Sequence, residues 1–165
     1  MSAIKSILPD SNFHTVDEET LPVKIKGRLL ALDLGSKRVG VAVCDELQLT
    51  AHPLPPLDRT NWKKLLRLIS DLRHSFDAQG VVIGLPLNLD GSEGDASREA
   101  RRIARNLSLS LTVPVHLQDE RLTSHAAEAS LRESGVMGKE LSERLDSESA
   151  ALILRDFIAQ QERHP

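Results

Sequence analysis

The chain has 165 residues, of which 40% are hydrophobic and 27% charged, and its formal net charge is −3, which together are typical of one soluble globular domain with a sizeable core. No apolar run approaches the roughly 18 residues of a membrane span, no secretory signal is recognisable and a single cysteine excludes an internal disulfide, so a cytoplasmic location is expected. The acidic total excludes attraction to nucleic acid by net charge alone, and the scarcity of aromatic side chains argues against single-strand binding by base stacking.

Residues 1–26 differ in character from the rest of the chain. They combine mixed polarity, two prolines and an acidic run at 17–19. These residues are predicted to form a loosely ordered N-terminal arm with no assigned role. Residues 27–165 show no internal repeat, no low-complexity tract and no sign of a second domain, so they are predicted to form one domain.

The first strands of this domain are predicted from two apolar runs. Leu29–Leu32 and Val39–Val43 flank the polar residues 35–38, which is the pattern of a β-hairpin. A third strand is predicted to begin near Leu49. Its prolines, at positions 53, 55 and 56, restrict this strand to a sheet edge or end it early.

The later elements alternate between helix and strand. In chain order they are a helix over 61–77 with Asn61 as its N-cap, a buried strand Val81–Gly84, a helix Asp95–Leu109, a strand Val113–Gln118, a helix over 124–134, a polar segment Gly135–Arg144 and a last helix starting at Asp146 or Ser147. This order predicts an α/β fold whose mixed five-stranded sheet joins an antiparallel meander to parallel strands. Helices are expected on both faces of that sheet.

Asp33 is the unusual residue of the first strand. Strand side chains alternate between two faces, and both faces of this strand are almost wholly apolar, so the strand is expected to be covered on both sides. A carboxylate there must be hydrogen-bonded, protonated, paired or bound to a metal, because burying it bare is costly. The alternative is that Asp33 caps the turn that follows.

Two further carboxylates can converge with Asp33 at one end of the sheet. They are Glu120, at the end of the last strand, and Asp146, at the start of the last helix. Oxygen ligands alone suit Mg²⁺ or Mn²⁺, and two such ions about 4 Å apart serve phosphodiester hydrolysis, with Asp33 as the candidate bridging ligand. Alternatively, Glu120 forms a surface pair with Asp119 and Asp146 is an N-cap.

Basic residues supply candidate contacts to nucleic acid. Four arginines of the predicted helix Asp95–Leu109 fall on one face by their spacing: Arg98, Arg101, Arg102 and Arg105. They form either a solvated helix face or a row that binds phosphates beside the loop before the helix. Candidate contacts also include Lys37, Arg38 and Arg121.

Four stretches of the chain together match the motifs of one family. They are Leu32–Asp45 (LDLGSKRVGVAVCD), Val81–Gly94 (VVIGLPLNLDGSEG), Gln118–Ser124 (QDERLTS) and Asp146–Phe157 (DSESAALILRDF). In this order and spacing they resemble the RuvX family, also named YqgF, of the ribonuclease H-like superfamily. The resemblance runs from about Arg28 to Ala159.

This resemblance implies a ribonuclease H-like fold and a cytoplasmic, metal-dependent bacterial nuclease that processes the 5′ end of the 16S rRNA precursor. The family's three acidic positions fall on Asp33, Glu120 and Asp146. The loop at 84–94 matches a family signature that is expected to shape the substrate cleft. RNA and a ribosomal particle are the implied partners, and the protein is expected to be a monomer or a homodimer.

The chain departs from the family pattern in two places. The arm before Arg28 is longer than the usual start, and the segment before Asp146, often rich in basic residues, offers only Lys139 and Arg144. The second departure bears on the contacts to nucleic acid rather than on the acidic site.

Three other functions compete with an RNA nuclease. A Holliday junction resolvase would act on branched DNA and would normally be a two-fold dimer. A binding factor in ribosome assembly or transcription would use the same fold without catalysis. An actin-like kinase or ATPase, suggested by DLGSKRVGVAV alone, needs two such domains, and 165 residues supply one.

Overall fold

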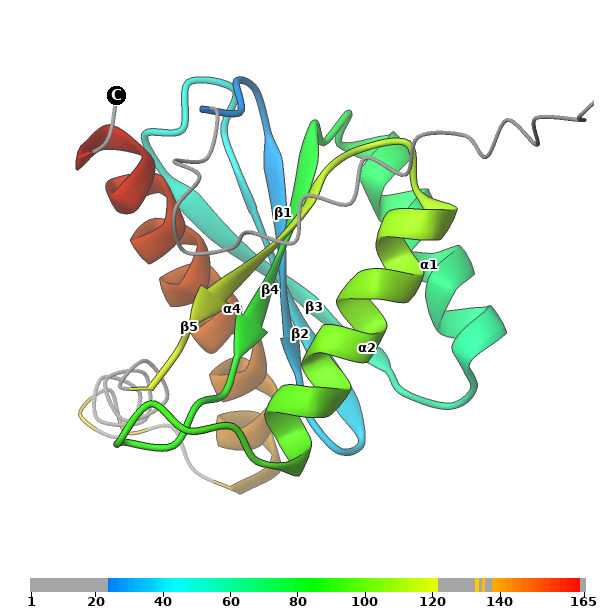
Figure 1. Ribbon diagram of the computed structural model, residues 1–165, viewed down its shortest axis with the longest axis vertical. Helices are drawn as coiled ribbons and strands as arrows, with labels where there is room; N and C mark the ends of the chain where they lie inside the picture. The colour runs from blue at the N-terminus through cyan, green and yellow to red at the C-terminus, as the bar shows by residue number, and fades with distance from the viewer. Residues whose placement is uncertain (1–23, 122–132, 134, 136–137, 164–165) are drawn as a thin grey trace, which may run out of the picture.

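A five-stranded sheet with strand order β3-β2-β1-β4-β5 forms the centre of the molecule in the computed structural model (Figure 1). The structure describes residues 24–121, 133, 135 and 138–163. Most of the predicted N-terminal arm, and the predicted helix over 124–134 apart from Glu133, lie outside these described residues. The elements are β1 (Leu29–Leu34), β2 (Arg38–Cys44), β3 (Ala51–Asp58), α1 (Trp62–Ser75), β4 (Gly80–Leu85), α2 (Asp95–Ser110), β5 (Val115–Asp119) and α4 (Gly138–Arg163).

The sheet is mixed, as the sequence predicts. β1 pairs antiparallel with β2, and β2 antiparallel with β3. The crossovers through α1 and α2 make β4 parallel to β1 and β5 parallel to β4. β1 therefore lies at the centre, and the carboxyl ends of β1, β4 and β5 reach the same edge of the sheet.

Helices cover both faces of the sheet, as Figure 1 shows. One face carries Leu32 and Val41, which pack with Ile69 of α1 and Ile103 of α2 in the larger core. The other face carries Leu29, Ala31 and Val82, which pack with α4 in a second core. α4 contacts all five strands of the sheet. Within the described residues, no helix is long and apolar enough to cross a membrane.

The third strand confirms the expected edge position but differs in its bounds. β3 begins at Ala51 rather than near Leu49, because the Asp45 carboxylate accepts hydrogen bonds from the backbone N–H groups of Leu49 (2.8 Å) and Thr50 (2.7 Å) and closes a turn there. The strand then continues through its three prolines to Asp58. Prolines are tolerated because an edge strand needs ladder donors on one side only.

The start of the last helix was predicted wrongly. α4 begins at Gly138, so residues 138–144 are helical rather than an irregular polar segment, and Asp146 lies inside the helix. Two ion pairs spaced four residues apart, Lys139–Glu143 and Arg144–Glu140, support these first turns, which have no apolar periodicity. Asp146 is therefore not an N-cap. Asn61, by contrast, is confirmed as the N-cap of α1, because its Oδ1 accepts from the backbone N–H of Lys64 at 2.9 Å.

Candidate active site

Asp33 lies near the carboxyl end of the central strand, on the face covered by α4. Leu29 and Ala31, which share its alternation along β1, both belong to the core beneath that helix. The side chain is partly buried. The fold thus sets one carboxyl group between the sheet and α4, at the edge where β1, β4 and β5 end.

Two glycines flank Asp33 on the neighbouring strands and leave room for other groups to approach it. Gly40 of β2 pairs directly with Asp33, and a Cβ atom there would lie 1.8 Å from the backbone oxygen of Asp146. Gly84 of β4 follows the last paired residue on the other side, and its Cβ would lie 2.5 Å from Glu120 Oε2. Sequence reasoning missed both roles, although a glycine inside a strand is a known sign of close approach.

Glu120 meets Asp33 in this space. Its backbone N–H donates to the carbonyl of Leu85 at 3.2 Å, which extends the β4–β5 pairing by one residue and directs the side chain over Gly84. The Oε2 atom of Glu120 is buried and has no hydrogen-bond partner among the described residues. The alternative that Glu120 forms a surface pair with Asp119 does not hold, since Asp119 bonds to Arg121 instead.

Both carboxyl groups hold a proton more tightly than usual, chiefly because they are buried. Burial raises the pKa of Glu120 to about 8, and the nearby charge of Asp33 adds to this rise. Burial also raises the pKa of Asp33 to about 6; a hydrogen bond with Glu120 opposes the rise, and the charge of Asp146 adds to it. Two carboxylates in one poorly solvated space cannot both ionise easily, so the pair retains a proton near neutral pH.

Asp146 reaches the same end of the sheet from α4, but its carboxylate is bonded to a cation. Its Oδ2 accepts a hydrogen bond from Arg38 Nε at 2.9 Å, and Arg38 Nη2 donates to Ser142 Oγ at 2.6 Å. Within the part of the chain that the structure describes, no three His, Cys, Asp or Glu side chains form a group that could hold a metal ion. The structure thus brings Asp33 and Glu120 together and places Asp146 beside them, turned toward Arg38.

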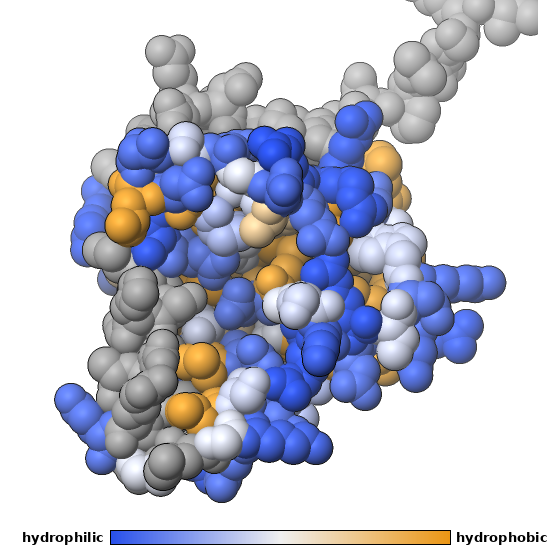
Figure 2. Space-filling view, turned by 90° about the horizontal axis from the view of Figure 1, so that it is seen from below, coloured by the Kyte–Doolittle hydropathy of each residue, from blue (hydrophilic) through white to orange (hydrophobic). Residues whose placement is uncertain are grey.

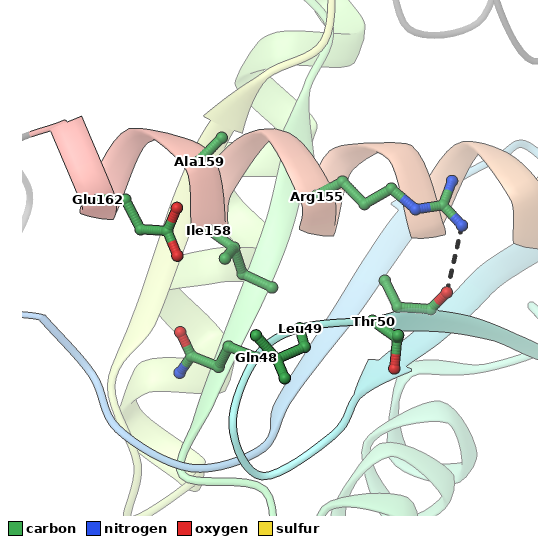
Figure 3. A pocket seen from close by; sticks show the side chains of 8 residues that line it. Gln48, Leu49, Thr50, Arg155, Ile158, Ala159 and Glu162 are labelled. Atoms are coloured by element: carbon green, nitrogen blue, oxygen red, sulfur yellow. Dashed lines mark hydrogen bonds between the residues drawn. The ribbon is translucent and has the colours of Figure 1, made fainter.

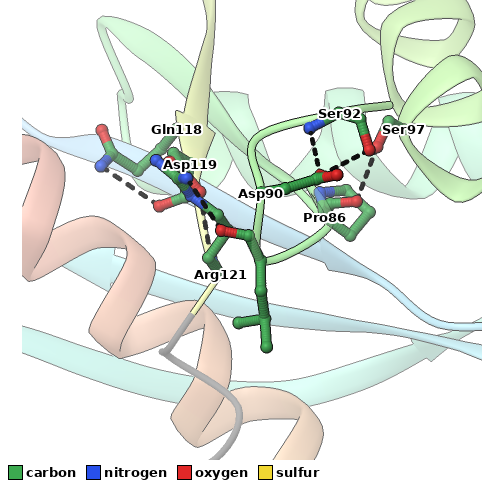
Figure 4. A network of polar contacts seen from close by, with 8 residues as sticks. Pro86, Asp90, Ser92, Ser97, Gln118, Asp119 and Arg121 are labelled. Carbon is green, nitrogen blue, oxygen red and sulfur yellow. Dashed lines mark hydrogen bonds and ion pairs between the residues drawn. The ribbon is translucent and has the colours of Figure 1, made fainter. Parts of the chain in front are cut away.

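The loop between β4 and α2 borders this end of the sheet and is fixed by short polar contacts (Figure 4). Asp90 accepts from the backbone N–H and the hydroxyl of Ser92, and these bonds lower the pKa of Asp90. Ser97 Oγ donates to the carbonyl of Pro86 at 2.6 Å. Arg121 follows β5, donates to Asp119 at 2.8 Å and reaches the carbonyl of Leu89 at 3.5 Å, so it links two edges of the candidate site.

The arginines of α2 do not present a row of unpaired charges. Three of them pair with carboxylates on or just before the helix: Arg98 with Asp95, Arg101 with Glu93 and Arg102 with Glu99. Such exposed pairs are weak and can exchange for phosphate, so contact of these residues with nucleic acid stays a prediction. The end of the molecule seen from below in Figure 2 is mainly hydrophilic, with a few separate apolar patches.

A separate groove lies toward the opposite end of the sheet, between the β2–β3 turn and the last turns of α4 (Figure 3). Its lining includes Leu49, Ile158 and Glu162. Arg155 donates to the carbonyl of Ala51 at 3.2 Å along one side of the groove. None of the three predicted acidic residues lines it, so it is distinct from the candidate active site.

Comparison with known proteins agrees with this architecture. The profile of the RuvX family, described as Holliday junction resolvase, matches residues 27–160. The crystal structure of the yeast mitochondrial Holliday junction resolvase shares the fold, with a TM-score of 0.50 and 12% identity, over 87% of this chain and 83% of that one. At this identity the likeness concerns the fold alone.

Relatives of known sequence are much closer. A protein of Syntrophus aciditrophicus (strain SB), named "Putative pre-16S rRNA nuclease", is 42% identical over 131 residues, which cover 79% of this chain and 87% of the relative. A protein of Anaeromyxobacter sp. (strain Fw109-5) with the same name is 44% identical over 132 residues, covering 79% and 96%. With the profile match over most of the chain, these identities show that the chain belongs to the RuvX family.

Proposed function

We propose that this protein is a metal-dependent nuclease that cleaves the 5′ end of the 16S rRNA precursor. The observation that supports this most directly is the pair of Asp33 and Glu120, buried against each other at the edge where three parallel strands end, with Asp146 beside it. Structural carboxylates are seldom buried in pairs, whereas catalytic ones often are. The relatives from Syntrophus and Anaeromyxobacter support the choice of substrate through their names.

The residues present fit a divalent cation on two counts. Every donor is a carboxylate oxygen, which suits Mg²⁺ or Mn²⁺, and the buried Oε2 of Glu120 has no partner among the described residues. Asp33, Glu120 and Asp146 would hold the cation, and phosphodiester hydrolysis at such a carboxylate site favours two ions. When bound, such ions activate water for attack on phosphorus and stabilise the leaving oxygen.

The chain's own residues prepare this site in two ways. The fold holds Asp33 between Gly40 and Gly84, so its carboxyl group stays within reach of both other acids. The raised pKa values of Asp33 and Glu120 mean that the pair must lose a proton before it binds a cation, so the affinity for metal rises with pH. Lys37 immediately precedes β2 and Arg121 follows β5 by two residues, and these two side chains are the proposed contacts to the phosphate backbone.

The proposal includes a cytoplasmic location and a precursor ribosomal particle as the physiological partner. A second function, cleavage of branched DNA, is favoured by the family's description as Holliday junction resolvase. A resolvase that cuts two strands symmetrically is expected to be a two-fold dimer.

A cleavage assay with Mn²⁺ and Mg²⁺ tests the proposal. Wild type and Asp33→Asn are incubated with a 5′ fragment of precursor rRNA and, separately, with a four-way DNA junction. Cleavage of the RNA by wild type alone is the expected result. Cleavage of the junction only would establish the second function, and no cleavage of either by folded protein would favour a binding factor.

A further inference from the structure

Arg38 is the cation bonded to one of the three proposed metal ligands. It lies at the start of β2, two residues before Gly40 and therefore on the same face of the sheet. Its guanidinium bridges one turn of α4, from the Asp146 carboxylate (2.9 Å) to the Ser142 hydroxyl (2.6 Å). The side chains of Arg38 and Asp146 are 24% and 26% exposed, so the ion pair is only partly screened by water.

This ion pair and a three-carboxylate metal site would use the same carboxylate of Asp146. While Asp146 is bonded to Arg38, the described residues contain no group of three acids that could hold a metal ion. Asp33 and Glu120 meet each other instead, and one buried oxygen of Glu120 has no hydrogen-bond partner in the part of the chain that the structure describes. Coordination of a cation through Oδ2 of Asp146 would require the bond between this atom and Arg38 to break.

Electrostatic repulsion among the three carboxylates explains why the positively charged Arg38 lies beside Asp146. Three carboxylates gathered without a counter-ion would repel one another in a poorly solvated space. Arg38 offsets one of these charges, and its planar fork is held in place by Ser142. A divalent cation would offset the same charge more completely, which makes the guanidinium dispensable once the cation is bound.

We propose that Arg38 is an exchangeable counter-ion, which competes with the divalent cation for Asp146 and thereby lowers the affinity of the site for metal. This inference rests on the proposed function, because it takes Asp146 as a metal ligand. The alternative role for Arg38 is to orient Asp146 toward the metal. In that role Arg38 would raise the affinity of the site for metal, as supporting residues around metal sites do. The two roles differ in the sign of the effect of removing Arg38.

The test is a Mn²⁺ titration of the full chain, with free Mn²⁺ measured by electron paramagnetic resonance. Arg38→Gln is expected to bind Mn²⁺ about fivefold more tightly than wild type, because the variant has no ion pair to break. A partly exposed ion pair stabilises by up to about 1 kcal/mol, which corresponds to this factor. Ser142→Ala, which removes only the second contact of the guanidinium, is expected to fall between the two. Arg155→Gln is the matched control, because it removes the same charge and an ion pair with Glu148, but the arginine lies nine residues beyond Asp146 on α4. This variant should bind Mn²⁺ like wild type.

A spectroscopic readout separates exchange from a general charge effect. The Nε–H signal of Arg38, assigned by its loss in Arg38→Gln, should shift on saturation with Mg²⁺ in a ¹H–¹⁵N spectrum, because its acceptor is withdrawn. Unchanged or weaker Mn²⁺ binding by folded Arg38→Gln, or an unmoved Nε–H signal at saturation, would overturn the exchange while leaving the metal site intact. Absence of Mn²⁺ binding by both proteins would overturn the metal site and the exchange together.

Discussion

At the scale of single residues, the chemistry of the site depends on two carboxyl groups that share a buried space. Asp33 and Glu120 both have raised pKa values, chiefly because burial disfavours their charged forms. Their protons are therefore bound more tightly in the folded chain than in the unfolded one. This linkage makes the stability of the protein without metal depend on pH in the region where both groups titrate.

We expect the free energy of unfolding in EDTA to fall as the pH rises from about 5 to about 9. The stabilising protonation is complete below the unfolded pKa values, near 4, and is lost as pH passes the folded values of about 6 for Asp33 and about 8 for Glu120. Each unit of pKa shift corresponds to about 1.4 kcal/mol, so the fall should amount to a few kcal/mol.

Urea unfolding across this pH range measures the effect, with Glu120→Gln as the comparison because a glutamine cannot ionise. The variant should lose less stability than wild type and become the more stable of the two at high pH. Parallel pH curves for the two proteins would show that Glu120 does not titrate abnormally.

At the scale of elements, the position of the site depends on how closely α4 crosses β2. The backbone of Asp146 rests on Gly40, which pairs with Asp33 in the sheet. The long range of this contact explains why the sequence could not predict it: the glycine in the strand was visible, but nothing local indicates which helix lies above it.

Gly40→Ala should therefore displace α4 and lower stability by about 3 kcal/mol, the upper range for overpacking a core. The added methyl group would meet backbone rather than a flexible side chain, so a rotamer change cannot relieve the clash. Thermal unfolding by circular dichroism measures the loss. Gly94→Ala is the control, because its new methyl group meets only Asn88 Oδ1, at 4.0 Å. Gly94 is the N-cap of α2, where alanine is disfavoured, so a cost of about 1 kcal/mol is expected there. Equal melting temperatures for Gly40→Ala and wild type would contradict the close crossing.

Most elements were predictable from local patterns, and the failures have physical causes. The period of apolar residues located α1 and α2, and the apolar runs located four strands within two residues. The first turns of α4 escaped prediction because ion pairs rather than apolar periodicity support them. The bond between Arg38 and Asp146 joins residues 108 positions apart and depends on the tertiary fold. Asp33 and Glu120 were visible in the sequence because charge stands out at the ends of apolar runs. Asp146 was singled out as the expected start of the last helix, but it lies inside that helix.

At the scale of the whole molecule, the topology brings distant segments together at both ends of the parallel strands. β1, β4 and β5 end beside one another, while the opposite edge is tied to the residues that precede β1. There, Gln48 Nε2 donates to the carbonyls of Ile25 (2.6 Å) and Gly27 (2.8 Å), and the N–H of Ile25 donates to Gln161 Oε1 at 2.9 Å. Ile25 also packs against the core beneath α4. These contacts join Ile25 and Gly27, which precede β1, to the β2–β3 turn and to α4.

A chain that starts at residue 24 should keep the melting temperature of the full chain, whereas one that starts at residue 28 should melt lower. The shorter chain leaves the buried amides of Gln48 and Gln161 without these partners, at a cost of about 1–3 kcal/mol for each unsatisfied group. Differential scanning calorimetry of the three chains measures the difference. Equal melting temperatures for the chains starting at residues 24 and 28 would place the domain boundary after Gly27.

The most direct test of the account is a crystal structure with Mn²⁺, phased to give an anomalous difference map of the metal. We expect Mn²⁺ bound by Asp33, Glu120 and Asp146, with the Asp146 carboxylate no longer bonded to Arg38, and no Mn²⁺ at this position in Asp33→Asn. Saturating Mn²⁺ that appears elsewhere, or a site that persists unchanged in Asp33→Asn, would contradict the claim that these three carboxylates form the metal centre of the enzyme.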